Sequence, residues 1–191
     1  MRKKGSASYA KEARAMESES CHGWNIASAP HDLFELLGNL DELNSFLGFV
    51  ISDLPIGRER ELLTDIQDGL FLIQAEIGAP DNADFPGRLG REHVLKLAEW
   101  SGEYDRMLTP LGRFIIPGGA KNAALLHCAR TMARRVERSS IRLCRRSQGN
   151  PFIPPYLDRL SYLLFQMARM INQQSGFKEK HPAYDCRRPS V

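Results

Sequence analysis

The sequence contains no long apolar run. Hydrophobic residues make up 42% of its 191 positions, but no stretch approaches the roughly 20 consecutive apolar residues that a membrane-spanning helix needs. The first residues, Met1-Arg2-Lys3-Lys4-Gly5-Ser6, also lack the apolar segment of a secretory signal. We therefore expect a cytoplasmic protein that does not bind a membrane.

Cysteine is scarce, and its spacing excludes two common kinds of site. Cys21, Cys128, Cys144 and Cys186 are scattered along the chain, and no two of them form a C-x-x-C pair. Such spacing fits neither a disulfide framework nor a zinc site. We expect reduced thiols, with Cys128 and Cys144 in the core or at its boundary.

The chain also has no strong excess of one charge. Its 26 Lys and Arg residues against 23 Asp and Glu residues leave a formal net charge of +3. Proteins that hold nucleic acid by releasing its counterions need a concentrated basic surface, which this mixture does not provide. We therefore do not expect nucleic acid as a partner.

What the sequence does contain is apolar residues at three- and four-residue steps, the pattern of amphipathic helices. The first such stripe consists of Leu33, Leu36, Leu37, Leu40, Leu43, Leu47 and Val50. The spacing predicts helices from about residue 32 to 55 and over about 58–78, 90–107, 120–147 and 153–175, with Pro and Gly between them. No repeat and no strand pattern stands out. The sequence thus predicts an all-α fold, a five-helix bundle.

The chain length suits one domain with a core of its own. Residues 1–28 are polar, rich in Ala, Ser, Glu and Lys, and have no useful apolar stripe, so we expect an arm that becomes ordered only against a partner. The helical domain is expected over residues 29–176. Residues 177–191 are expected to form a C-terminal tail.

The predicted fourth helix carries a row of charged side chains. Arg130, Arg134 and Glu137 follow one another at steps of four and three, so they share a face. Two guanidinium groups one turn apart suit phosphate oxygens, and a carboxylate beside them can hold a magnesium ion or fix an arginine. The same spacing fits a solvated face with ion pairs, which is the commoner arrangement. His127 on this helix is expected to be a packed residue, not a metal ligand, because no second ligand is suitably spaced.

Two further features leave alternatives open. Asp41 lies in a largely apolar helix, where a buried carboxylate would need a cation such as Arg130, although it can equally face solvent. Phe114 precedes the turn Pro117-Gly118-Gly119, which leads into a helix N-terminus able to attract an anion. Phe114 itself could instead be an ordinary core residue.

Several separated motifs agree in order and spacing with those of one known family. They are Arg113–Gly119 together with Ala124–Arg138, the first-helix stretch Leu40–Ser45, the stretch Ile66–Phe71, and Tyr156–Ser161. From about residue 36 to 175 the chain resembles the PduO-type ATP:cob(I)alamin adenosyltransferases. The resemblance implies a five-helix bundle that assembles as a homotrimer and binds ATP and cobalamin where two subunits meet.

The resemblance also implies a reaction. The reduced cobalt of cob(I)alamin attacks the 5′ carbon of ATP, and tripolyphosphate leaves with the help of Mg²⁺. The protein would align the reactants and neutralise the leaving group. By this likeness Phe114 packs where the lower axial base of cobalamin would otherwise sit, which makes the cobalt easier to reduce.

The signature helix supplies most of the other implied roles. Arg130 is expected to pair with Asp41 across or near the subunit interface and to position the cofactor. Arg134 and Arg135 are expected to contact the phosphates. Glu137 would help to hold the nucleotide or its magnesium ion.

At two places the sequence differs from the family pattern. Family members begin with a Thr-Lys-x-Gly-Asp-x-Gly loop that wraps the triphosphate, whereas the nearest match here retains only Lys4 and Gly5. Asp158 stands where the family has Asn, and Tyr162 where it has Asp. We place Lys4, Gly5, Asp158 and, in the first-helix motif, Asn44 among the expected binding residues.

Three functions are therefore considered. The favoured one is an active adenosyltransferase with a divergent nucleotide loop, which would deliver its product to an adenosylcobalamin-dependent acceptor enzyme. The second is a non-catalytic relative that binds a corrinoid or another tetrapyrrole as a carrier or regulator. The third is a helical bundle that serves only as an oligomeric interaction module, against which the retained Phe114, Arg130 and Asp41 argue.

Overall fold

The computed structural model describes residues 31–78, 87–146 and 149–183. Within these ranges the chain forms five helices and no strand: α2 (His31–Asp53), α3 (Arg58–Gly78), α4 (Arg91–Met107), α5 (Lys121–Arg146) and α6 (Ile153–Gln174). The prediction of an all-α, five-helix fold is confirmed, with helix ends close to the expected residues. The predicted arm over residues 1–28, with Lys4 and Gly5, lies outside the described residues.

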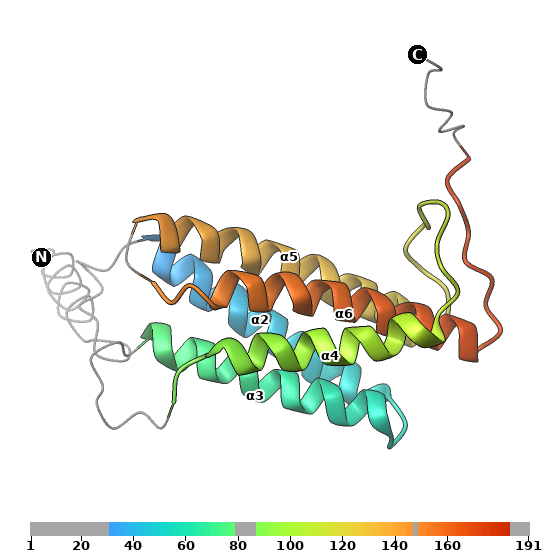
Figure 1. Cartoon of the computed structure of the whole chain (residues 1–191), viewed down its shortest axis with the longest axis horizontal. Coiled ribbons are helices and arrows are strands. Elements are labelled where there is room, and N and C mark those ends of the chain that lie inside the picture. The colour runs from blue at the N-terminus through green and yellow to red at the C-terminus, as the bar shows by residue number, and fades with distance from the viewer. Residues whose placement is uncertain (1–30, 79–86, 147–148, 184–191) are drawn as a thin grey trace, which may run out of the picture.

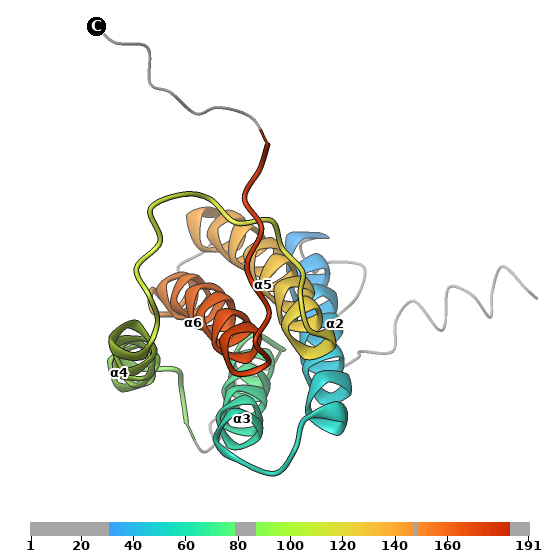
Figure 2. The same cartoon turned by 90° about the vertical axis from the view of Figure 1, so that its right-hand side faces the viewer.

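The helices lie side by side along the long axis of the molecule (Figure 1). α5 packs against α6 and α2, α4 packs against α6, and α3 packs against α2. Viewed along the bundle, α6 lies between α3, α4 and α5 (Figure 2). This central place explains why α6 has buried residues along nearly its whole length, from Ile153 to Asn172.

Leucine and isoleucine build most of the core, as their spacing in the sequence predicts. Among the fully buried side chains are Leu40, Leu43, Leu63, Ile66, Leu126 and Leu160. The inward stripe of α5 also contains Ala129 and Ala133, and small side chains there let the backbones of packed helices approach closely. A close approach also occurs at Gly69 on α3, where an added Cβ would overlap the hydroxyl of Tyr156 on α6.

The same α5 stripe corrects one prediction. Cys128 is exposed, so its expected place in the core or at its boundary is wrong, whereas Cys144 is half-buried as expected. The reason is the helical phase, because the buried residues Leu126, Ala129 and Val136 point to one side and position 128 lies well off it. None of the described helices is both long and apolar enough to cross a membrane.

Candidate active site

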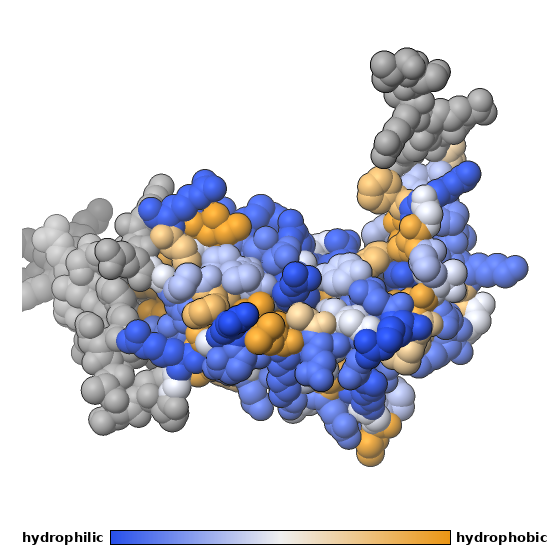
Figure 3. Space-filling model, in the orientation of Figure 1, coloured by the Kyte–Doolittle hydropathy of each residue, from blue (hydrophilic) through white to orange (hydrophobic). Residues whose placement is uncertain are grey.

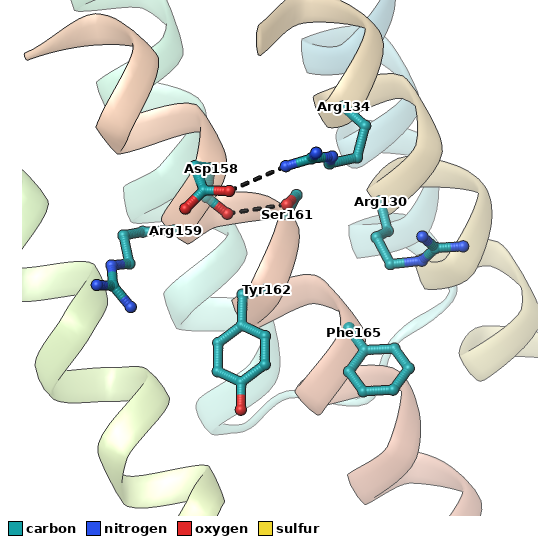
Figure 4. A pocket seen from close by; sticks show the side chains of 7 residues that line it. All are labelled: Arg130, Arg134, Asp158, Arg159, Ser161, Tyr162 and Phe165. Atoms are coloured by element: carbon teal, nitrogen blue, oxygen red, sulfur yellow. Dashed lines mark hydrogen bonds and ion pairs between the residues drawn. The ribbon is translucent and has the colours of Figure 1, made fainter. Parts of the chain in front are cut away.

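A hollow of about 410 Å³ opens between α5 and α6 (Figure 4). Its lining residues are Arg130, Arg134, Asp158, Arg159, Ser161, Tyr162 and Phe165. The two α5 arginines reach it together because they are four residues apart on one helix face. Three guanidinium groups against one carboxylate leave the lining with an excess of positive charge, so the hollow suits an anion.

Arg134 is held by carboxylates from both helices. Its Nη1 atom lies 2.6 Å from Oε2 of Glu137 on α5 and 2.9 Å from Oδ1 of Asp158 on α6. The Glu137 side chain is only 11% exposed. Burial raises the pKa of Glu137, and the charge of Arg134 opposes this rise. The charged face predicted on α5 is therefore not fully solvated. It is also not a pair of unoccupied arginines ready to bind phosphate, because Arg134 already has carboxylate partners.

Arg130, by contrast, forms no ion pair with any described residue, and its Nε atom is buried without a hydrogen-bond partner. Burial lowers the pKa of Arg130, and the nearby charge of Arg134 lowers it further. A guanidinium that is partly removed from water and has no carboxylate partner is costly to keep. An anionic ligand in the hollow would offset that cost.

His127, one turn before Arg130, is buried as predicted, at 3% exposure. Burial and the charge of Arg130 lower its pKa to about 4, so the ring is neutral at pH 7. Neither ring nitrogen has a hydrogen-bond partner among the described residues. The ring lies 6.0 Å from that of Phe165, a residue of the hollow. His127 thus supports the wall of the hollow without adding charge to it.

The predicted residues of α2 lie outside the hollow. Asp41 is exposed and forms no ion pair with Arg130 within the described chain. Its neighbour Glu42 pairs instead with Arg135, which therefore points toward α2. Asn44 is 3% exposed, and its side-chain oxygen is buried without a partner.

Phe114 lies elsewhere, on the connection between α4 and α5. Its side chain is 77% exposed, which excludes the alternative of an ordinary core residue. The following turn adopts conformations that favour glycine, with φ of 151° at Gly118 and 113° at Gly119. Asn172 of α6 holds this turn, since its amide donates to the Gly118 oxygen at 3.0 Å and accepts from the Ala120 N–H at 2.9 Å.

Sequence reasoning missed Arg159, Ser161 and Phe165 as lining residues. A signal for part of this set was present, because positions 158, 161, 162 and 165 follow one another at steps of three, one and three along α6 and so share a face. Tyr162 donates its hydroxyl to Asp105 on α4 at 3.0 Å, which ties this face to α4.

The family model for cobalamin adenosyltransferases matches residues 20–171. The chain belongs to the cobalamin adenosyltransferase family. The family predicted from the separated motifs is thus confirmed.

Individual relatives agree with this family assignment. A cobalamin adenosyltransferase of Cupriavidus metallidurans is 36% identical over 141 residues, which cover 73% of this chain and 74% of the relative. A corrinoid adenosyltransferase of Bacillus subtilis is 38% identical over 148 residues, covering 74% of this chain and 75% of the relative.

Solved structures of the family share the bundle. A variant of the PduO-type ATP:corrinoid adenosyltransferase from Lactobacillus reuteri, complexed with cobalamin and ATP, is similar with a TM-score of 0.73 and 27% identity. The match covers 80% of this chain and 87% of that one. Another variant of the same enzyme, complexed with ATP, is similar with a TM-score of 0.71 and 28% identity, covering 79% of this chain and 87% of that one.

Proposed function

We propose that this protein transfers the 5′-deoxyadenosyl group of ATP to cob(I)alamin, giving adenosylcobalamin and tripolyphosphate. The proposal rests on the hollow between α5 and α6. Arg130 and Arg134 lie there one helical turn apart, and the residues that line the hollow carry more positive than negative charge. A chain of this family with such a hollow has the groups that a triphosphate needs.

The chemistry requires little from the protein. The cobalt of cob(I)alamin forms a bond to C5′ of ATP, and the bond from C5′ to the triphosphate oxygen breaks with its electron pair leaving on that oxygen. Because the cobalt is a strong nucleophile, no protein base is needed. The protein aligns the two substrates and neutralises the charge that grows on the leaving triphosphate. Arg134 does this directly, and Arg130 positions the cofactor beside it.

A magnesium ion fits this arrangement. Mg²⁺ is commonly held by one or two carboxylates together with substrate phosphates. Glu137 offers a carboxylate whose side chain is only 11% exposed, and the ion would share its Oε2 oxygen with Nη1 of Arg134, which lies 2.6 Å away. When bound there, the ion supplies further positive charge to the leaving group.

Phe114 is assigned to the corrinoid. An aromatic ring that is 77% exposed at the end of the bundle is a costly feature for a free surface. On the face shown in Figure 3, polar side chains prevail, and apolar patches are scattered among them, some of them where this loop and the segment after α6 lie. Packed against the lower face of cobalamin, the ring of Phe114 would exclude the axial base and ease reduction of the cobalt.

The proposal includes a homotrimer. Phe34 and Phe49 of α2 are 37% and 54% exposed, and their spacing puts them on the same helix face as Asp41. A subunit contact over this face would bury both rings and bring Asp41 to the partner subunit's Arg130. Lys4, Gly5 and Arg135 are then assigned to the phosphates, and Asn44 and Asp158 to the wall around the nucleotide. We place the enzyme in the cytoplasm, where it would deliver its product to an adenosylcobalamin-dependent acceptor enzyme.

One observation favours a second candidate, a non-catalytic corrinoid-binding carrier or regulator. Asp158 forms an ion pair with Arg134, the arginine assigned to the phosphates, and therefore competes with a phosphate for it. The two candidates are separated by incubating the purified protein with chemically reduced cobalamin, ATP and Mg²⁺ and following adenosylcobalamin by its absorbance. Turnover supports the enzyme, whereas corrinoid binding without turnover supports the carrier.

A further inference from the structure

The chain segment after α6 folds back along the loop that carries Phe114. Gly176 turns the chain with a φ of 67°, and the Phe177 N–H donates to the Asn172 oxygen at 2.8 Å. Residues 179–181, which we call the strap, then run beside the loop, as both views of the bundle show (Figures 1 and 2). The Ile116 N–H donates to the oxygen of Lys180 at 2.7 Å. Nδ1 of His181 lies 2.9 Å from the oxygen of Phe114 and, since a carbonyl only accepts, acts as the donor.

A single buried arginine ties the strap to the bundle. Nε of Arg169 on α6 lies 3.2 Å from both carboxylate oxygens of Glu179, and Nη2 donates to the oxygen of Thr109 at 2.7 Å. The side chains of Arg169 and Glu179 are only 10% and 17% exposed. A charge-assisted contact shielded from water is stronger than a surface ion pair. Arg169 therefore fixes both the start of the Phe114 loop and the strap.

The loop has few other attachments. Among the described residues, the hydrogen bonds of backbone groups in residues 109–119 go to α6 or to the strap, at Thr109, Phe114, Ile116 and Gly118. The ring of Phe114 is largely exposed, so packing within the chain does little to hold it. Where this ring stands is therefore set by the backbone contacts that the strap and α6 make.

We propose that Glu179 and His181 are positioning residues of the corrinoid site: the strap, anchored by Arg169, holds the Phe114 loop so that the ring meets the lower face of the corrinoid. This inference rests on the proposed function of Phe114. Without the strap, the loop keeps its hydrogen bonds to Asn172 at one end. The segment around Phe114, however, loses its two hydrogen bonds, from Ile116 to Lys180 and from His181 to Phe114. Catalysis that depends on aligning two bound substrates is sensitive to such a loss, because small misplacements cost large factors in rate.

The test compares Glu179→Gln with wild-type full-length protein. Lys178→Gln is the matched control, since it changes a neighbouring exposed side chain outside the strap and also removes one charge. The readouts are the absorption spectrum of bound cob(II)alamin, which reports whether the lower axial base is coordinated, the kcat, and the KM for ATP. Circular dichroism reports whether each variant is folded.

We expect Glu179→Gln to shift the cob(II)alamin spectrum toward the base-on form and to lower kcat by roughly ten- to a hundredfold. The KM for ATP should change less than kcat, because neither Glu179 nor His181 lines the nucleotide hollow. The control should match wild type in every readout. An unchanged spectrum and kcat in folded Glu179→Gln would overturn the inference.

A second variant covers the case in which Glu179→Gln fails to fold and leaves Arg169 without its partner. His181→Ala removes an exposed side chain and one contact to Phe114, and we expect a smaller shift in the same direction. If this folded variant behaves as wild type, the strap does not position the ring. Failure of the proposed function looks different, because then wild type shows no turnover, or Phe114→Ala has the wild-type spectrum.

Discussion

Arg134 on α5 and Asp158 on α6 form an ion pair of 2.9 Å across the hollow between the two helices. In the proposed function the same guanidinium binds the leaving triphosphate. The carboxylate of Asp158 and a phosphate oxygen therefore compete for the guanidinium of Arg134. Because Glu137 also lies 2.6 Å from this nitrogen, the arginine does not lose all negative neighbours when a phosphate replaces Asp158.

The first prediction concerns this competition. Asp158→Asn removes a negative charge from the hollow and frees one side of Arg134. Since an exposed ion pair contributes about 0.2–1 kcal/mol, the affinity for Mg²⁺-free tripolyphosphate should rise by up to about fivefold. Isothermal titration calorimetry measures the affinity for tripolyphosphate. Asp65→Asn is the matched control, because Asp65 forms an exposed ion pair with Lys96 at 3.0 Å outside the hollow. Weaker binding by Asp158→Asn would mean that Asp158 helps to hold the anion.

The second prediction concerns the two arginines. Arg130→Ala and Arg134→Ala should each lower turnover by roughly a hundredfold or more, because the first variant loses the group that positions the cofactor and the second loses the charge that stabilises the leaving triphosphate. The melting temperature should change little in Arg130→Ala, because Arg130 has no ion pair among the described residues, and should fall in Arg134→Ala, which leaves the largely buried Glu137 without its cation. Arg130→Lys should also lower turnover, because an ammonium group cannot reproduce the planar fork. Arg145→Ala, an exposed change on the same helix, is the control. Wild-type turnover in both alanine variants would disprove the assignment.

The third prediction is a pH dependence of stability. The pKa of His127 lies at about 4, against 6.5 for an ordinary histidine, because burial and Arg130 disfavour the charged ring. The unfolded chain therefore binds a proton that the native chain does not, and stability is lost as pH falls from 6.5 toward 4. In His127→Leu this loss disappears. The free energy of unfolding of the variant relative to wild type should rise over this range by up to on the order of 3 kcal/mol. Denaturant titrations at pH 7 and pH 4 measure it, and an equal difference at both values would contradict it.

The fourth prediction concerns the turn after Phe114. Gly119 has a φ of 113°, and an added Cβ would overlap the amide of Asn172. Gly119→Ala should therefore destabilise the protein by about 1–3 kcal/mol and weaken corrinoid binding, because the turn loses its anchor. Gly112→Ala in the same loop is the control, since a Cβ there meets nothing within 4 Å. Thermal unfolding and corrinoid titration measure both effects. A Gly119→Ala variant as stable as the control would argue against the anchored turn.

The fifth prediction concerns assembly. Light scattering should find a trimer for the wild-type protein. Phe49→Asp should give smaller species, because it puts a charge on the proposed contact face of α2, where the ring is 54% exposed. Ile56→Asp, at a 90% exposed position between α2 and α3, is the control and should leave the assembly unchanged. A wild-type monomer at micromolar concentration would remove the proposed site between subunits.

Much of the bundle was predictable from local pattern. Leu33, Leu40 and Leu47 recur at helical steps and are buried in the structure, because a helix with one apolar face is stable only when that face is covered. The helix ends followed from Pro and Gly, which cannot continue a helix without cost. The shared face of Arg130 and Arg134 followed in the same way, since a step of four residues is slightly more than one helical turn.

The sequence by itself therefore determined the helices, their inward faces and the motifs of the family, because each depends on residues that are near one another along the chain. Only the tertiary structure decided the partners of these groups. Asp158 meets Arg134 across 24 positions, and His181 meets Phe114 across 67. Such contacts depend on how α6 and the segment after it pack against α5 and the loop. Periodicity along one helix says which side a residue faces, but the packing of separate segments decides what it meets there.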